Sequence, residues 1–216
     1  MRQTERKEQV AIQANRASLD GTLELPDEPI GIVLFAHGSG SSRLSPRNNY
    51  VAEELRRASM GTLLLDLLTP HEDQIYTMRF DIALLTARLR AAIAWLGQHH
   101  SSQGLPIGLF GASTGAAAAL QAAARPDVDI AAVVSRGGRP DMAGQHALQR
   151  VRAPTLLIVG GRDDVVIDLN RAAFASLRCE RQLEIIPGAT HLFEEPGKLE
   201  AVAALSVAWF GRHLAR

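Results

Sequence analysis

The stretch Leu105-Pro-Ile-Gly-Leu-Phe-Gly-Ala-Ser113-Thr-Gly115 decides the fold of this chain, and an alanine-rich segment follows it directly. Residues 105–110 form a short apolar run, which is typical of a strand buried on both faces of a parallel sheet. Residues 114–124 have the pattern of a helix. The motif G-x-S-x-G thus stands between a strand and a helix, a setting that places a nucleophilic serine on a sharp turn. Its glycines permit close approach of the backbones, and the helix N-terminus offers N–H groups to an oxyanion.

Apolar runs and helical patterns alternate along the rest of the chain. The other runs are 31–36, 61–66, 130–134, 155–159 and 183–186, and the other candidate helices are 48–58, 80–98, 168–177 and 199–214. This alternation predicts right-handed βαβ units. Residues 8–26 differ, because two short alternating runs flank Asp20-Gly21, a dipeptide typical of a hairpin turn. We expect one α/β domain over residues 1–216, with a mostly parallel twisted sheet, helices on both faces and an N-terminal antiparallel hairpin.

A serine hydroxyl becomes a nucleophile when a base takes its proton. In this strand–turn–helix setting the partners follow in the order Ser, acid, His. Asp163 and Asp164 come directly after the run 155–159, and His191 comes after the last run, 183–186. We favour Asp163 as the acid because it leaves the strand first, and Asp164 remains the alternative. The sequence therefore predicts a triad of Ser113, Asp163 and His191.

A second loop suits the stabilisation of negative charge. Residues His37-Gly-Ser-Gly40 follow the run 31–36, and small residues there leave room for a backbone N–H to point at the site. We assign the N–H of Ser39 as one oxyanion donor, with Gly38 as the alternative. The N–H of Thr114, next after the nucleophile, is the other donor. His37 is expected to be a structural histidine that bonds the loop backbone.

Arginines follow the strand ends where ligands bind in open α/β sheets. Arg136 and Arg139 come after the run 130–134, and Arg43 and Arg79 lie in further candidate rim loops. One hypothesis is that such an arginine, with Arg136 and Arg139 foremost, binds a carboxylate or phosphate of the substrate. The alternative is a structural ion pair with a carboxylate of this chain, for which the candidates are Asp141, Glu194 and Glu195.

Four motifs in order carry a resemblance to a known family: His37-Gly-Ser-Gly40, Gly111-Ala-Ser-Thr-Gly115, Gly160-Gly-Arg-Asp-Asp-Val-Val166 and Gly188-Ala-Thr-His191. The chain resembles the α/β-hydrolase superfamily over residues 8–215 and, within it, the dienelactone-hydrolase-like group of small hydrolases. Many members of that group carry a cysteine where this chain has Ser113, which favours ordinary ester chemistry here. The resemblance implies cleavage of a small ester or lactone through an acyl-enzyme, with no metal and no organic cofactor.

Composition excludes several other classes of protein. The chain of 216 residues has 23 Lys and Arg against 23 Asp and Glu, which argues against a nucleic-acid module and a polybasic membrane anchor. Its single cysteine, Cys179, excludes an intramolecular disulfide and zinc sites built on several cysteines. Residues 1–10 lack the apolar core of a signal peptide, and no apolar run could span a bilayer. We expect a cytoplasmic monomer or homodimer whose partner is a small-molecule ester.

Two further expectations concern the pocket and the type of reaction. Few residues separate the runs 130–134 and 155–159, so we expect no large cap and an open, shallow pocket. The apolar side chains of Val207, Trp209 and Phe210 on the last helix are expected to belong to the core rather than to a dimer contact. A thioesterase, peptidase or acyltransferase could use the same triad. A non-catalytic binding protein with this fold is the alternative from another class.

Overall fold

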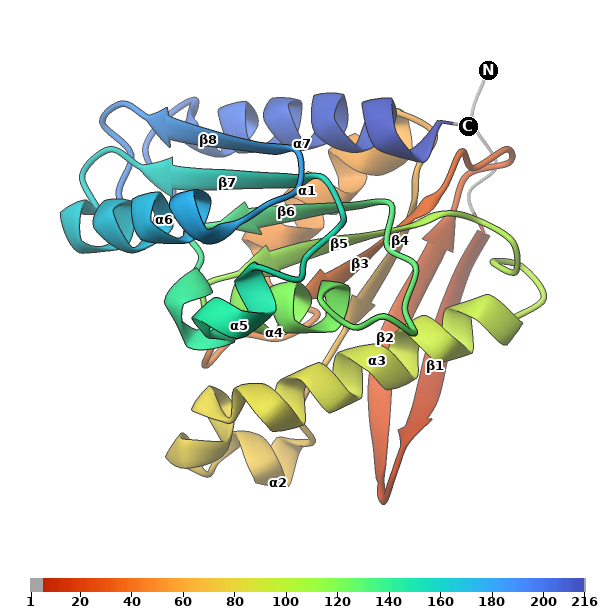
Figure 1. The fold of residues 1–216 in the computed structure, drawn as a ribbon. Coiled ribbons are helices and arrows are strands. Elements are labelled where there is room, and N and C mark those ends of the chain that lie inside the picture. Colours follow the sequence, from red (N-terminus) through yellow and green to blue (C-terminus); the bar gives the residue numbers. More distant parts are fainter. Residues whose placement is uncertain (1–5, 216) are drawn as a thin grey trace.

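The structure, a computed structural model, describes residues 6–215; residues 1–5, part of the N-terminal segment considered above, and residue 216 lie outside the described residues. Its centre is an eight-stranded sheet in the order β1-β2-β4-β3-β5-β6-β7-β8 (Figure 1). The strands β3 to β8 run parallel, whereas β1 pairs antiparallel with β2, and β2 with β4. The strands are β1 (Arg6–Ala14), β2 (Ala17–Leu25), β3 (Ile32–Ala36), β4 (Gly61–Leu65), β5 (Ile107–Ala112), β6 (Ala132–Arg136), β7 (Thr155–Gly160) and β8 (Arg181–Ile186). The expected α/β architecture is confirmed.

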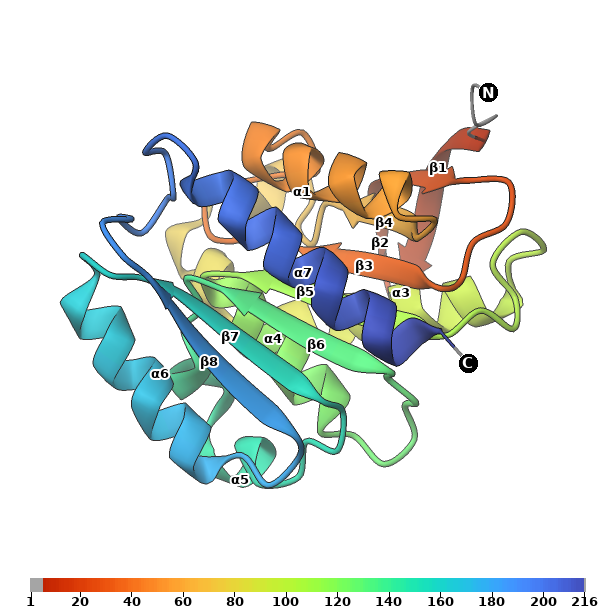
Figure 2. The same cartoon turned by 90° about the horizontal axis from the view of Figure 1, so that it is seen from above.

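Helices cover both faces of the sheet. Figure 2 looks onto the face covered by α1 and α7, and in Figure 1 the helices α3 to α6 lie below the sheet. The helices are α1 (Pro46–Arg57), α2 (Pro70–Asp73), α3 (Ile82–Gln98), α4 (Thr114–Ala123), α5 (Gln145–Leu148), α6 (Asp164–Ser176) and α7 (Lys198–Leu214), with the 3-10 turns η1 (Tyr76–Phe80) and η2 (Pro140–Ala143).

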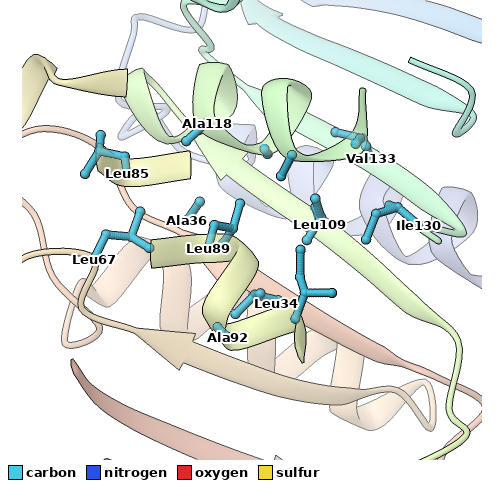
Figure 3. Close-up of a cluster of buried hydrophobic side chains, with 14 of the residues drawn as sticks. Leu34, Ala36, Leu67, Leu85, Leu89, Ala92, Leu109, Ala118, Ile130 and Val133 are labelled. Carbon is cyan, nitrogen blue, oxygen red and sulfur yellow. The ribbon is translucent and has the colours of Figure 1, made fainter. Parts of the chain in front are cut away.

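The two sides of the sheet have separate cores. On the side of α3 and α4, the side chains of Leu34, Leu89, Leu109 and Val133 pack together with the alanines of α4 (Figure 3). Alanines on the buried face of α4 allow this helix to lie close to the strands. On the other side, the core includes Phe210, which is fully buried.

The last helix closes this second core. Trp209 and Phe210 are 3% and 0% exposed, so the expectation that they belong to the core is confirmed, whereas Val207 is only partly buried against the same core. The benzene ring of Phe210 lies directly on β5, where a Cβ added to Gly108 would come within 2.6 Å of its Cε1 atom. Helix α7 therefore packs on the strand that leads to Ser113.

The N-terminal hairpin exists, but its turn is not where Asp20-Gly21 predicted it. The strands pair from Arg6↔Leu25 to Ala14↔Ala17, so the turn lies at Asn15-Arg16, with Asn15 in the left-handed region at φ 58°. Asparagine tolerates that region better than most residues. Gly21 lies inside β2, where an added Cβ would come within 3.0 Å of the Val10 side chain. Packing rather than a turn thus explains this glycine.

The connections between strands are short. Only η2 and α5 lie between β6 and β7, so the expectation of no large cap is confirmed. Within residues 6–215, no helix has the length and apolar character required to cross a membrane. The carboxyl ends of β5, β7 and β8 meet at one edge of the sheet, on the left in Figure 1, and the loops after these strands carry the predicted triad.

Candidate active site

Ser113 lies on a strained turn between β5 and α4. Its backbone has φ 50° and ψ −121°, a conformation that costs a non-glycine residue about 1–3 kcal/mol. The flanking positions require glycine because other backbone atoms lie too close for a side chain. A Cβ at Gly111 would lie 2.4 Å from Ala116 Cα, and one at Gly115 would lie 2.2 Å from Ala36 O. The local reason for G-x-S-x-G inferred from the sequence is confirmed.

Backbone hydrogen bonds to the neighbouring strand fix this turn. The Ser113 N–H donates to Arg136 O at 3.2 Å, and the Arg139 N–H donates to Ser113 O at 3.0 Å. Both partners belong to the end of β6 and the loop that follows it. The serine is therefore held by the neighbouring strand as well as by its own, as a preorganised nucleophile requires.

Asp163 and His191 form a direct pair. The Nδ1–H of His191 donates to Asp163 Oδ2 at 2.6 Å, with the two side chains 38% and 18% exposed. A carboxylate in this position fixes the tautomer of the imidazole and stabilises the imidazolium. Asp164 instead lies in the first turn of α6 and is exposed. The structure thus brings Asp163, and not Asp164, against the histidine.

The histidine loop is held by Glu195, which was considered above only as an arginine partner, and by Phe193, which the sequence did not single out. The Thr190 N–H donates to both carboxylate oxygens of Glu195, at 3.1 and 3.2 Å, and this bond lowers the pKa of Glu195. Phe193 is 1% exposed and has φ 57°. A phenylalanine two residues after the histidine was the available signal, because a large apolar residue in a polar loop often anchors it in the core.

The glycine-rich loop after β3 lies against the serine. A Cβ at Gly38 would be 3.0 Å from Ser113 Cβ and 3.7 Å from Ser113 Oγ. The Ser39 N–H, predicted as an oxyanion donor, donates to Thr114 Oγ1 at 3.0 Å in this structure. An oxyanion would therefore have to displace or share this hydroxyl. Gly38, the alternative donor, is the loop residue in direct contact with Ser113.

His37 has the structural role expected for it. The Leu67 N–H donates to His37 Nε2 at 3.0 Å, so Nδ1 carries the proton and donates to Gly38 O at 2.9 Å. Burial lowers the pKa of His37, which keeps the ring neutral. The side chain ties the loop after β3 to the loop after β4 and is not available as a base.

Three of the four arginines considered above pair with carboxylates. Arg139 binds Asp141 through two hydrogen bonds of 2.9 and 2.7 Å, which raise the pKa of Arg139. Arg43 pairs with Asp66, and Arg79 pairs with Asp73. Glu194 and Glu195, the other proposed partners, are taken by Arg47 and Thr190.

Arg136 is the exception. The residue is 8% exposed and its side chain lies against the start of α1, where Nη2 donates to Asn48 Oδ1 at 3.4 Å, while Nε and Nη1 have no partner within residues 6–215. Desolvation, reinforced by the nearby charge of Arg47, lowers the pKa of Arg136 to about 10. A buried charge without a counterion is costly, and within residues 6–215 no carboxylate forms an ion pair with Arg136.

A hollow of about 150 Å³ lies beside the glycine-rich loop, lined by residues that include His37, Ser41, Leu68 and Pro70. Its lining also includes Asp66 and Asp73, but not Ser113, Asp163 or His191. Among the residues that the structure describes, no group of three or more His, Cys, Asp or Glu side chains could hold a metal ion. The chemistry available at this edge is that of the serine, the acid–histidine pair and backbone N–H groups.

The fold and this arrangement define a protein of the α/β-hydrolase class. The chain belongs to the dienelactone hydrolase family, whose model matches residues 66–210. A dienelactone hydrolase from Anabaena variabilis is 52% identical, with a TM-score of 0.93 and coverage of 97% of this chain and 98% of that one. Est1E from Butyrivibrio proteoclasticus is only 16% identical but shares the fold, with a TM-score of 0.82 over 96% of this chain and 99% of its own.

Curated relatives extend beyond the matched region. A protein of Mycobacterium tuberculosis, provisionally named a phosphoribosyl transferase, is 56% identical over 209 residues. The match covers 97% of this chain and 47% of that protein, so the chain spans about half the length of the curated relatives it matches.

Proposed function

We propose that this chain is a serine hydrolase that cleaves a small carboxylic ester or lactone through an acyl-enzyme. The observation that carries the proposal is the strained Ser113 turn at the sheet edge that also holds the hydrogen-bonded Asp163–His191 pair. Membership of the dienelactone hydrolase family supports hydrolysis as the reaction class. The transferase name of the curated relatives describes proteins of about twice this length.

In the proposed mechanism, Ser113 Oγ attacks the ester carbonyl while His191 Nε2 accepts its proton. His191 then donates this proton to the leaving alcohol, and an acyl-enzyme remains on Ser113. Water attacks the acyl group with His191 again as base, which restores the serine. Asp163 holds the imidazole through Nδ1–H and stabilises its charged form.

The tetrahedral intermediates carry an oxyanion. We assign its stabilisation to the N–H of Thr114 at the start of α4 together with an N–H of the loop after β3, from Ser39 or Gly38. Preorganised donors of this kind each contribute about 2.7–4 kcal/mol to catalysis. The Thr114 hydroxyl that now accepts from Ser39 marks the place where the substrate oxygen would enter.

The test is the release of p-nitrophenol from p-nitrophenyl acetate and butyrate by purified protein. Ser113→Ala keeps a side chain on the strained turn and removes the nucleophile, so we expect a loss of at least about 10³-fold in kcat. Ser101→Ala, in the loop between α3 and β5, is the matched control and is expected to be unchanged. Equal turnover by wild type and Ser113→Ala would overturn the proposal.

We further propose that Arg136 holds an anionic group of the substrate. Its guanidinium has two unpartnered nitrogens within residues 6–215, and the backbone oxygen of the same residue accepts a hydrogen bond from the Ser113 N–H. Arg139, also predicted as a substrate arginine, is already neutralised by Asp141. The substrate that best fits the site is therefore an ester or lactone with a second, negatively charged group.

Arg136→Met and Arg139→Met separate these roles. We expect Arg136→Met to lower kcat/KM for an anionic ester at least tenfold more than for a neutral ester, and Arg139→Met to affect both equally. Arg136→Met should also raise the free energy of unfolding, because an uncompensated buried charge is removed. An equal fall for both esters in Arg136→Met would refute the assignment.

A further inference from the structure

A second hollow lies at the opposite edge of the sheet from Ser113. It has a volume of about 500 Å³ and is formed where α4 ends, where α5 leads into β7 and where α6 leads into β8. In Figure 2, α5 and the connection from α6 to β8 lie side by side at the lower edge. We call this the arginine hollow, because three arginines line it: Arg150, Arg152 and Arg178.

None of these three arginines forms an ion pair within residues 6–215. Arg152 Nη2 donates to the backbone oxygen of Pro126 at 3.4 Å, which holds this side chain across the hollow. For Arg150 and Arg178 the described part of the chain supplies no side-chain hydrogen bond. Three exposed guanidinium groups therefore share one concave surface on a chain whose formal net charge is zero.

The carboxylates of the neighbouring segments are engaged elsewhere. Asp127 pairs with Arg90 at 2.6 Å and with Arg125 at 3.6 Å. Glu180, next to the hollow in sequence, lies 3.7 Å from His213 and 4.0 Å from Arg212. Asp129 is exposed in the adjoining loop and does not line the hollow. The lining of the arginine hollow itself therefore carries three positive charges and no carboxylate.

The rest of the lining is apolar or neutral. Ala124, Val151 and the ring of Pro126 contribute to it, together with the half-buried Cys179. Burial raises the pKa of the Cys179 thiol, which therefore stays uncharged at neutral pH. A volume of about 500 Å³ falls within the usual range of small-molecule sites. The hollow thus combines three arginines with neutral residues in one lining.

We propose that the arginine hollow binds a small phosphorylated organic molecule. Its phosphate groups would bind the forked guanidinium groups of Arg150, Arg152 and Arg178, which suit phosphate oxygens in both charge and geometry. Its organic part would lie against Ala124, Val151 and Cys179. This site is separate from Ser113, and ligand binding here does not require hydrolytic activity.

Cys179 gives a direct readout, because it is the only cysteine of the chain and lines the hollow. The experiment measures the rate at which a thiol reagent modifies Cys179, with ADP or inorganic pyrophosphate as ligand and sodium chloride at equal ionic strength as control. We expect ADP at millimolar concentration to slow modification at least fivefold. ADP should protect Cys179 at a lower concentration than pyrophosphate does, since only ADP has an organic part that can contact the neutral residues of the hollow. Titration calorimetry with ADP measures binding independently of thiol reactivity.

Matched variants locate the ligand. Arg150→Ser and Arg178→Ser change exposed side chains without packing roles, so the fold should be retained, and each should weaken ADP binding about tenfold. Arg171→Ser, on the exposed face of α6, is the control and should bind like wild type. Three results would overturn the proposal: no heat and no protection with ADP, equal protection by sodium chloride, or unchanged affinity in both variants.

Discussion

Replacing Asp163 by asparagine removes the negative charge that faces His191 and keeps the shape of the side chain. The Nδ1–Oδ2 distance of 2.6 Å places the two charge centres about 4 Å apart, where unit charges near a protein surface interact by about 4 kcal/mol. The surface value applies because the two side chains are 18% and 38% exposed. When His191 accepts the proton of Ser113, this attraction stabilises the imidazolium. Its loss predicts a fall in kcat of about 10³-fold.

The assay compares kcat for p-nitrophenyl acetate in wild type, Asp163→Asn and Asp164→Asn. Because Asp164 is exposed on α6 and does not contact His191 in this structure, we expect its variant to stay within about twofold of wild type. KM should change little in either variant, since in the proposed mechanism Asp163 acts through His191 and Asp164 takes no part. The reasoning is refuted if Asp163→Asn retains more than a tenth of the wild-type kcat. It is also refuted if kcat falls further in Asp164→Asn than in Asp163→Asn.

Three further predictions concern stability, measured by urea unfolding. Gly115→Ala forces a Cβ to within 2.2 Å of a backbone oxygen and should lower the free energy of unfolding by about 3 kcal/mol. Gly97→Ala, in open space on α3, should instead stabilise the protein by about 0.5–1 kcal/mol. Equal effects of the two substitutions would contradict the packing argument. Phe210→Ala, at a fully buried position, should cost about 3–5 kcal/mol, and a loss under 1 kcal/mol would mean that α7 is not integral to the core. Burial lowers the pKa of His37, so below about pH 6.5 the unfolded chain binds a proton that the folded chain does not. The free energy of unfolding should therefore fall on acidification by up to about 1.4 kcal/mol per pH unit, with a shallower slope in His37→Gln. Parallel slopes in wild type and His37→Gln would exclude His37 as the source of the pH dependence.

Much of the fold could be predicted because its signals are local. Each central strand is a continuous apolar run, since strands buried on both faces need no polar positions. The strand–turn–helix pattern around Ser113 is equally local, and the contact that requires Gly111 is with Ala116 of the same turn; Gly115, in contrast, lies against Ala36 O at the end of β3. The order of Ser113, Asp163 and His191 then follows from the order of the strands.

What the sequence did not reveal depends on contacts between distant segments. Asp20-Gly21 has the composition of a turn, but the strand register and the packing of Val10 place it inside β2. The bond of the Ser39 N–H to Thr114 joins residues far apart in sequence. Helices α2 and α5 have four residues each and are too short to show a period.

The pairing of arginines shows the same limit. Arg136 and Arg139 are three residues apart and were equivalent in the sequence. Only side-chain geometry separates them, because Arg139 reaches Asp141 whereas Arg136 turns inward under α1. Local pattern predicts where an arginine leaves a strand, and the three-dimensional neighbours decide whether its charge is compensated.

The φ of 50° at Ser113 implies a conflict between thermal robustness and function in this protein. A residue without a side chain adopts that conformation with little cost, whereas serine holds it only because the surrounding strands enforce it. Ser113→Gly should therefore melt at a higher temperature than wild type while losing all turnover. Selection for heat resistance alone would then favour inactive descendants at this position, and any engineering programme that ranks variants by melting temperature needs an activity screen beside it.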